Sequence, residues 1–268
     1  MAKMKSLITK PEPFVVANWK MNLDISESEE LIVSLREGLK DFRGKCEIVA
    51  CPSFCALERM HQLLIASKIF LGAQNVFWEE KGAYTGETSI RMLKEVGCRF
   101  VIIGHSERRK YVHEDDEMID RKMVTVVKNQ LTPILCVGET SEQRRQNVQD
   151  LLITDQVKKA LRYIQLPLVS QKIIIAYEPV WSIYPGQPCE PDQAKEIALV
   201  IKQALIDLYP LKIVENFFRI IYGGSVTFAN VNDYVDGEII QGVLIGNASL
   251  EADNFIKIIK KVVKNVKK

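Results

Sequence analysis

The sequence predicts an α/β fold, namely a (β/α)8 barrel in which eight parallel strands are ringed by helices. First, short apolar runs rich in β-branched residues alternate with longer amphipathic stretches. Second, there are eight such runs, and a strand followed by a helix, when repeated, requires parallel strands. Third, this barrel usually takes roughly 250 residues, and the chain has 268 residues, of which 47% are hydrophobic. We therefore expect a single domain over residues 1–268.

The strands are expected where the chain reads FVVANW, EIVAC, IFLGA, FVIIG, PILCV, KIIIAY, FRIIY and IIQGVLI. These runs occupy residues 14–19, 47–51, 69–73, 100–104, 133–137, 172–177, 218–222 and 239–245. Most of them are apolar nearly throughout, which is typical of parallel strands that are covered on both faces.

Signals for helix starts lie between these runs. Ser26 followed by Glu29 fits a capping box, in which each of two residues caps a backbone amide of the other. Thr140 followed by Gln143 fits a second one. Pro191 suits the first turn of a later helix, where its missing amide costs nothing.

Composition and charge exclude several classes of partner. Lysine plus arginine number 36 against 34 aspartates plus glutamates, which gives no reason to expect nucleic acid or an acidic membrane. Residues 257–268 alternate Lys with Ile and Val, as in a helix with a solvated basic face rather than a membrane anchor. The six cysteines lack zinc-type spacing, and residues 6–14 include Lys10 and Pro11 where a signal peptide needs an apolar run. We expect reduced thiols, no metal and a cytoplasmic protein.

An open doubly wound sheet is the main alternative fold. It would more often carry a glycine-rich dinucleotide motif after the first strand, whereas this chain continues Asn18-Trp19-Lys20-Met21-Asn22. In a closed barrel, active sites lie at the carboxyl ends of the strands. The polar residues and glycines at those positions are Asn18, Lys20, His105, Glu178, Ser225, Gly246 and Asn247.

Glu178 and His105 stand where acid–base chemistry could occur. Glu178 ends an apolar run and precedes Pro179 and Trp181, and an apolar wall of this kind predicts a raised pKa that suits a catalytic base. A lone glutamate is more often a solvated surface group. His105 lies between a strand and the amino terminus of a helix, whose partial positive charge disfavours the imidazolium.

Lys20 and two glycine clusters complete the expected rim. Lys20 lies between Trp19 and Met21, which suggests a partly desolvated ammonium, although most lysines are solvated. Residues 223–225 and 246–247 each follow an apolar run. Turns after strands favour glycine in any protein, but backbone amides after strands seven and eight of this barrel recurrently bind phosphate, and we favour that interpretation.

Four clusters together resemble the triosephosphate isomerase family, in the order that the family has them. They are residues 17–22 (ANWKMN), 102–109 (IIGHSERR), 177–181 (YEPVW) and 222–226 (YGGSV). The resemblance covers nearly the whole chain and implies a TIM barrel that interconverts dihydroxyacetone phosphate and glyceraldehyde 3-phosphate in glycolysis and gluconeogenesis, without cofactor or metal. It implies that Glu178 is the base that forms the enediolate, while His105 and Lys20 stabilise the charge on oxygen.

The same resemblance implies further contacts. Substrate-binding residues would be Asn18, Lys20, Tyr184, Ser225, Gly246 and Asn247. It also implies a homodimer, in which the loop at residues 74–87 docks beside the partner's active site and Thr85 reaches the region of the partner's Asn18. The apolar residues of this loop would leave an exposed patch on a monomer. They are Val76, Phe77, Trp78 and Tyr84.

Two stretches depart from the family pattern. After Trp181 the family usually continues Ala-Ile-Gly-Thr-Gly-Lys-Thr-Ala, whereas residues 182–189 here read SIYPGQPC. Tyr184 replaces a glycine whose amide meets the phosphate, and the two prolines lack an amide and narrow the conformations of this lid loop. Asn247 replaces a second glycine after Gly246, and asparagine tolerates a positive φ. These departures bear on turnover more than on the identity of the reaction.

Two rival functions follow from the same residues. A barrel could keep the phosphate site and yet turn over poorly because its lid is altered. Alternatively, the chain could be another phosphate-binding barrel, such as an aldolase or a synthase of tryptophan biosynthesis. An aldolase would need a Schiff-base lysine late in the barrel, whereas the sixth strand leads into Glu178.

Overall fold

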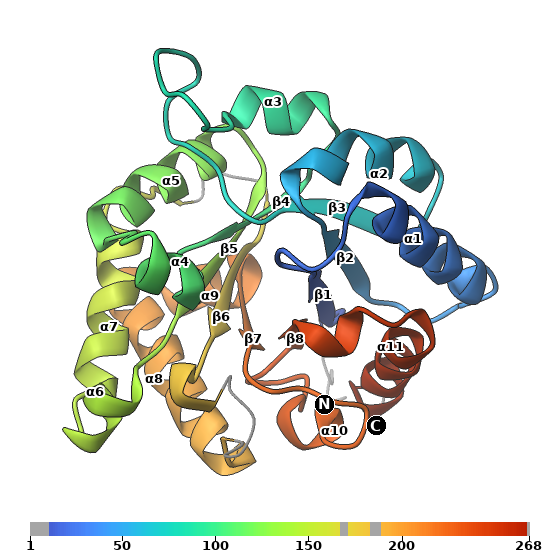
Figure 1. Ribbon diagram of the computed structural model, residues 1–268. Coiled ribbons are helices and arrows are strands. Elements are labelled where there is room, and N and C mark those ends of the chain that lie inside the picture. Colours follow the sequence, from blue (N-terminus) through green and yellow to red (C-terminus); the bar gives the residue numbers. More distant parts are fainter. Residues whose placement is uncertain (1–10, 167–170, 183–188, 267–268) are drawn as a thin grey trace, which may run out of the picture.

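The computed structural model describes residues 11–166, 171–182 and 189–266. Its strands form one closed barrel in sequence order, each parallel to its neighbours, and β1 also pairs with β8. Figure 1 shows the strands at the centre with the helices around them, which confirms the predicted fold class. The strands are β1 (Phe14–Asn18), β2 (Glu47–Cys51), β3 (Ile69–Ala73), β4 (Phe100–Ile103), β5 (Thr132–Val137), β6 (Ile173–Tyr177), β7 (Phe218–Tyr222) and β8 (Gly242–Ile245).

Helices follow the strands along the chain. The α-helices are α1 (Ile25–Leu39), α2 (Leu57–Leu64), α3 (Ile90–Glu95), α4 (Ser106–Tyr111), α5 (Asp116–Lys128), α6 (Ser141–Arg145), α7 (Gln149–Ala160), α8 (Pro191–Leu208), α9 (Leu211–Phe217), α10 (Val231–Tyr234) and α11 (Ala252–Val266). Single 3₁₀ turns are η1 (Phe54–Ala56), η2 (Val180–Ser182) and η3 (Asn247–Ser249). The capping box of Thr140 and Gln143 starts α6, and Pro191 lies in the first turn of α8, so both predictions are confirmed.

The capping box predicted for the first helix is wrong by two residues. Asp24, not Ser26, is the N-cap of α1: its carboxylate accepts from the amide of Glu27 at 2.8 Å, and the Glu27 carboxylate accepts from the amide of Asp24 at 2.9 Å. Both pairs have the spacing of a capping box, so the pattern alone does not rank them. A carboxylate at the N-cap also interacts favourably with the helix dipole, which a serine hydroxyl does not.

The last strand is shorter than predicted. β8 begins at Gly242 rather than at residue 239. The carboxylate of Asp236 accepts hydrogen bonds from the amides of residues 238, 239 and 240, and it thereby holds them in a bend before the strand. Ile239 and Ile240 are therefore part of the loop that leads into β8 and not of the strand itself.

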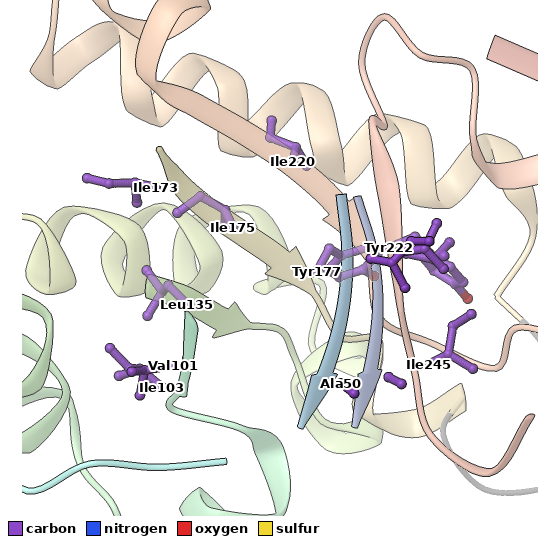
Figure 2. Close-up of a cluster of buried hydrophobic side chains, with 14 of the residues drawn as sticks. Ala50, Val101, Ile103, Leu135, Ile173, Ile175, Tyr177, Ile220, Tyr222 and Ile245 are labelled. Atoms are coloured by element: carbon purple, nitrogen blue, oxygen red, sulfur yellow. The ribbon is translucent and has the colours of Figure 1, made fainter. Parts of the chain in front are cut away.

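The core has two layers because successive side chains of each strand point to opposite faces. One set fills the inside of the barrel: Phe14, Val16, Val49, Cys51, Phe100, Ile102, Ile134, Cys136, Ile174, Ala176, Ile221 and Leu244. The alternate residues pack under the helices, and Figure 2 shows several of them, including Leu135, Ile175 and Ile220. On α11 the apolar side chains at residues 255, 258, 259 and 262 are fully buried in this outer layer.

The thiols fit the expected reduced state. All six cysteines are free, and four of them are buried, whereas Cys46 is partly exposed and Cys55 is exposed. Among the residues described, no helix is both long enough and apolar enough to cross a membrane.

Candidate active site

A cavity of about 180 Å³ opens at the carboxyl ends of the strands. It brings together six of the residues predicted from the sequence, namely Asn18, Lys20, His105, Ser225, Gly246 and Asn247. They come from the ends of β1, β4, β7 and β8, which lie far apart in the sequence. Glu178 lies beside His105, whose Nε2 is 3.0 Å from the carboxylate oxygen Oε1.

The register of β6 determines where Glu178 points. Its side chain is in phase with those of Ile174 and Ala176, which fill the inside of the barrel. The amide of Glu178 donates to the carbonyl of Val137 on β5 at 2.8 Å. A Cβ on Gly138 would lie only 1.8 Å from the carbonyl oxygen of Glu178, so a glycine is required there. The side chain of Glu178 is 2% exposed, so the carboxylate is buried at the edge of the cavity.

The carboxylate of Glu178 is held by the loop that follows β4. Oε2 accepts from the amide of Ser106 at 2.9 Å, and Oε1 faces His105 but accepts no well-aligned hydrogen bond from the described part of the chain. Burial raises the pKa of Glu178, but His105 and the amide of Ser106 together outweigh burial and leave the pKa lowered. The predicted rise is therefore wrong. That prediction rested on the apolar residues next to Glu178 in the sequence, whereas His105 and Ser106 come from a distant part of the chain.

His105 caps the start of α4. Its Nδ1 accepts from the amide of Glu107 at 3.2 Å, so the proton of a neutral ring lies on Nε2, the nitrogen that faces Glu178. Burial lowers the pKa of His105, but the neighbouring carboxylate of Glu178 more than offsets burial and leaves the pKa raised. The hydrogen-bond pattern thus fits the expected neutral imidazole, while Glu178 favours the imidazolium as long as its carboxylate stays beside the ring.

Lys20 has a strained backbone that its neighbours hold in place. Its φ is +53°, in the left-handed region that non-glycine residues rarely adopt. The side chain of Asn18 accepts from the amide of Lys20 at 3.1 Å, and Gln74 donates to its carbonyl at 2.8 Å. Its Nζ contacts Oε1 of Glu107 at 2.6 Å. Sequence reasoning missed Glu107 as a site residue, although its position two residues after His105 was a usable signal.

The two glycine clusters frame the cavity on the side of β7 and β8. Within the described residues, no hydrogen bond occupies the amides of Gly224 and Ser225, while the amide of Gly223 donates to the carbonyl of Tyr177 at 2.8 Å. Free amides at this position can bind an anion. Asn247 begins η3 and does not have a positive φ. The ability of asparagine to adopt a positive φ is therefore not needed for it to replace glycine here.

A second missed residue is Glu139, which follows β5 and is fully buried. Its Oε1 accepts from Trp181 Nε1 at 2.7 Å, from Arg144 at 2.9 Å and from the hydroxyl of Tyr177 at 3.1 Å. Tyr177 and Trp181 lie on either side of Glu178, so Glu139 holds a side chain on each side of that residue. Candidate site residues were taken from the ends of other strands but none from the end of β5. Including that strand end would have found Glu139.

Thr85 does not reach the cavity of its own chain. It is exposed on the segment between β3 and α3, which projects from the body of the molecule (Figure 1). The ring of Phe77 contacts those of Trp78 and Tyr84 at tilted angles, with ring centroids 4.1 and 4.7 Å apart, and Tyr84 is exposed. Val76 is fully buried in its own chain, so its expected exposure is wrong.

The altered stretch after Ser182 is described only at its ends. Tyr184, Pro185 and Pro188 lie outside the described residues, so the contact expected of Tyr184 stays a prediction. Cys189 is described and is buried.

The arrangement offers three kinds of group around one small cavity. Glu178 is a carboxylate that can accept a proton, His105 presents a ring N–H, and Lys20 presents a positive charge. Such a set suits the removal of a proton beside a carbonyl, because the negative charge then develops on an oxygen that the donors can stabilise. Across the described ranges, no three or more His, Cys, Asp or Glu side chains gather to hold a metal ion.

Comparisons with known proteins agree with this arrangement. The family model described as triosephosphate isomerase matches residues 13–262. The chain is 42% identical to the triosephosphate isomerase of Dictyoglomus turgidum, over 92% of this chain and 98% of the relative. It is 41% identical to that of Caldanaerobacter subterraneus subsp. tengcongensis over the same shares, and 40% identical to that of Lactobacillus delbrueckii subsp. bulgaricus over 92% and 97%. Its fold, its rim of polar residues and these similarities show that the chain belongs to the triosephosphate isomerase family, a family of isomerase enzymes.

Proposed function

We propose that this protein interconverts dihydroxyacetone phosphate and D-glyceraldehyde 3-phosphate through an enediolate, in glycolysis and gluconeogenesis in the cytoplasm. The observation that carries the proposal is the pairing of Glu178 with His105 at a cavity that also holds Lys20 and two glycine-rich loops. Membership of the family supports the choice of substrate.

The reaction would move protons between two neighbouring carbons. Glu178 takes a proton from the carbon beside the carbonyl, and the electron pair moves onto the carbonyl oxygen to give the enediolate. A proton then passes from the hydroxyl oxygen of that carbon to the former carbonyl oxygen, and the same carboxylic acid returns its proton to the former carbonyl carbon, which leaves the new carbonyl on the other carbon. To do so, Glu178 must leave the amide of Ser106 and turn into the cavity. Since one carbon of the substrate is oxidised as its neighbour is reduced, no electrons pass to another molecule, and the reaction needs neither a redox cofactor nor a metal.

His105 and Lys20 would stabilise the oxygen charge of the enediolate. The proton on Nε2 of His105 can be donated to the substrate oxygen once Glu178 leaves it. With the carboxylate gone, burial remains and lowers the pKa of His105 against the smaller opposing effect of Glu107, which favours the neutral ring. Lys20 adds a fixed positive charge whose carboxylate partner is Glu107.

The phosphate would lie against the loops after β7 and β8. The amides of Gly224 and Ser225 are available to an anion, and Gly246 and Asn247 line the same cavity. Tyr184 would contribute from the lid. A lid over the phosphate would also exclude water and retain the enediolate, which otherwise loses phosphate.

We also propose that the active form is a homodimer. Tyr84 and Thr85 are exposed on the projecting loop, and Met21, next to Lys20, is 95% exposed. A partner that covers Met21 with this loop would bury apolar surface beside the site.

A coupled assay tests the proposal. Purified protein supplied with glyceraldehyde 3-phosphate should form dihydroxyacetone phosphate, which glycerol-phosphate dehydrogenase and NADH would report. The expected result is turnover without added metal or cofactor, unaffected by a chelator. Inorganic phosphate that binds at the rim of a protein without turnover would instead support a phosphate-binding barrel with no isomerase activity.

A further inference from the structure

Tyr234 lies outside the cavity, but it holds one end of the segment that follows Glu178. The tyrosine is at the end of α10 and is buried, and its hydroxyl donates to the carbonyl of Cys189 at 2.6 Å. The amide of Cys189 in turn donates to Oγ of Ser182 at 3.0 Å. These two hydrogen bonds join both described ends of the segment to each other and to α10.

The ring of Tyr234 connects the same point to the loop after β7. It stacks on Tyr222, with ring centroids 4.0 Å apart and planes 8° from parallel. The hydroxyl of Tyr222 packs against the next loop: a Cβ on Gly224 would lie 2.3 Å from it and 3.0 Å from Cγ of Pro179. Tyr222 therefore lies against the loop whose amides are available to phosphate, and Pro179, the residue after Glu178, lies against the same glycine. In Figure 2 Tyr222 lies beside Tyr177, which precedes Glu178.

The hydroxyl of Tyr222 lies among polar groups of both segments. It is buried and makes no well-aligned hydrogen bond to any described residue, although Tyr234 and Ser182 lie near enough to affect its pKa, which burial raises. Buried hydroxyls are seldom left without a partner. A small shift of Cys189, Ser182 or the loop after β7 would change what this hydroxyl meets, so the position that Tyr234 sets for Cys189 bears on both segments.

We propose that Tyr234 is a positioning residue that couples the segment following Glu178 to the phosphate loop at residues 223–225. The substrate of that site rests on the proposed function. Tyr234 meets none of the reacting atoms. It acts because a buried hydrogen bond fixes Cys189, while its stacking on Tyr222 fixes the start of the loop. Phosphate bound to that loop is thereby linked to the placement of Glu178.

Tyr234→Phe tests the coupling because it removes the hydroxyl and keeps the stacked ring. Tyr209→Phe is the matched control. Tyr209 directly follows α8. Its hydroxyl donates to the carbonyls of Ile164 at 2.9 Å and Leu161 at 3.3 Å, and its ring packs on Phe218. Each variant thus loses hydrogen bonds from a tyrosine to backbone carbonyls, but only one of them loses a bond to the segment after Glu178.

Three quantities are to be measured on wild type and both variants: kcat, the ratio of released inorganic phosphate to isomerised product, and the Kd for inorganic phosphate. For Tyr234→Phe we expect kcat to fall about 3-fold to 10-fold, the effect of one net hydrogen bond. The elimination ratio should rise and phosphate should bind more weakly. Tyr209→Phe should lower thermal stability about as much as Tyr234→Phe does, but it should change neither the elimination ratio nor the phosphate Kd.

The outcomes separate this inference from the proposed function. Equal elimination ratios and equal phosphate Kd values in the two variants would overturn the coupling, even if the wild type isomerises. A wild type without isomerase activity would overturn the proposed function alone. In that case the phosphate Kd still decides the inference: weakening in Tyr234→Phe but not in Tyr209→Phe supports it, and no difference contradicts it.

Discussion

At the scale of the residue, Glu178 and His105 set each other's protonation. Burial alone would make both neutral, since it raises the pKa of a carboxyl and lowers that of an imidazole. Their separation of 3.0 Å reverses both effects, so that the pKa of Glu178 lies below 4.5 and that of His105 above 6.5. In the free protein the proton between them therefore favours the imidazole. When Glu178 turns toward a substrate, His105 loses the partner that favours its charge.

Glu178→Gln should therefore lower the pKa of His105. The glutamine keeps the shape but removes the carboxylate, and burial then dominates. NMR titration of the imidazole nitrogens measures this, with His61 and His113 as internal references. An unchanged titration of His105 would show that the two side chains are not paired in solution.

The same pair predicts how stability depends on pH. The lowered pKa of Glu178 gives a stabilisation that is present above pH 4.5 and lost as pH falls through the folded value. The raised pKa of His105 gives one that is present below pH 6.5 and lost as pH rises through the folded value. Glu178→Gln should thus lower the melting temperature most between these two values, and by less as the pH falls below or rises above them. A difference that is constant with pH would contradict the pairing.

How much of the site could be predicted from the sequence depended on where each contact comes from. Positions after strands follow from the barrel itself, which is why residues such as Asn18, His105 and Ser225 were found at one cavity. Glu107 and Glu139 also follow strands and could have been found in the same way, but their contacts with Lys20 and Trp181, 87 and 42 residues away along the chain, could not. The direction of the pKa shift of Glu178 was mispredicted because His105 and Ser106, which lower this pKa, also come from a distant part of the chain.

Among the secondary-structure elements, the strands were predictable. Apolar runs of about five residues are too short for a buried helix, and they lie between longer amphipathic stretches, so a buried parallel strand is the structure that fits them. The ends of elements were less predictable, since a single side chain decides them. Asp236 delays the start of β8, and Asp24 rather than Ser26 begins α1. Local hydrogen bonds of this kind compete among neighbouring polar residues, and the sequence pattern does not rank the competitors.

Asp24→Ala should destabilise the protein, whereas Ser26→Ala should not. Loss of the capping carboxylate leaves the amide of Glu27 without its partner, at a cost of about 0.5–2 kcal/mol. Ser26 is exposed inside the first turn and serves as the control. Urea unfolding of both variants measures the difference. Equal loss in the two, or loss only in Ser26→Ala, would restore the cap predicted from the sequence.

In the molecule as a whole, closing the barrel gathers strand ends that are distant in the sequence, and the loop that carries Thr85 projects away from the barrel (Figure 1).

We expect Thr85→Arg to weaken the proposed dimer and lower activity together, because a buried unpaired charge at an interface is costly. Gln146→Arg, on the exposed end of α6, adds the same charge elsewhere and should change neither. Sedimentation at assay concentrations checks both variants. A fully active monomer of the wild type would contradict the in-trans contact of Thr85.

The most direct test of the account is solvent deuterium exchange during turnover, with wild type and Glu178→Gln. In D₂O the wild type should isomerise glyceraldehyde 3-phosphate and place deuterium on the carbon that receives the proton, since the acid form of Glu178 exchanges with solvent. Glu178→Gln should lose about 10²-fold to 10⁴-fold in kcat, and lose the labelling with it. It should still bind inorganic phosphate as the wild type does. A variant that keeps more than about a tenth of wild-type kcat, or still labels that carbon at the wild-type rate, would contradict the assignment of Glu178 as the base.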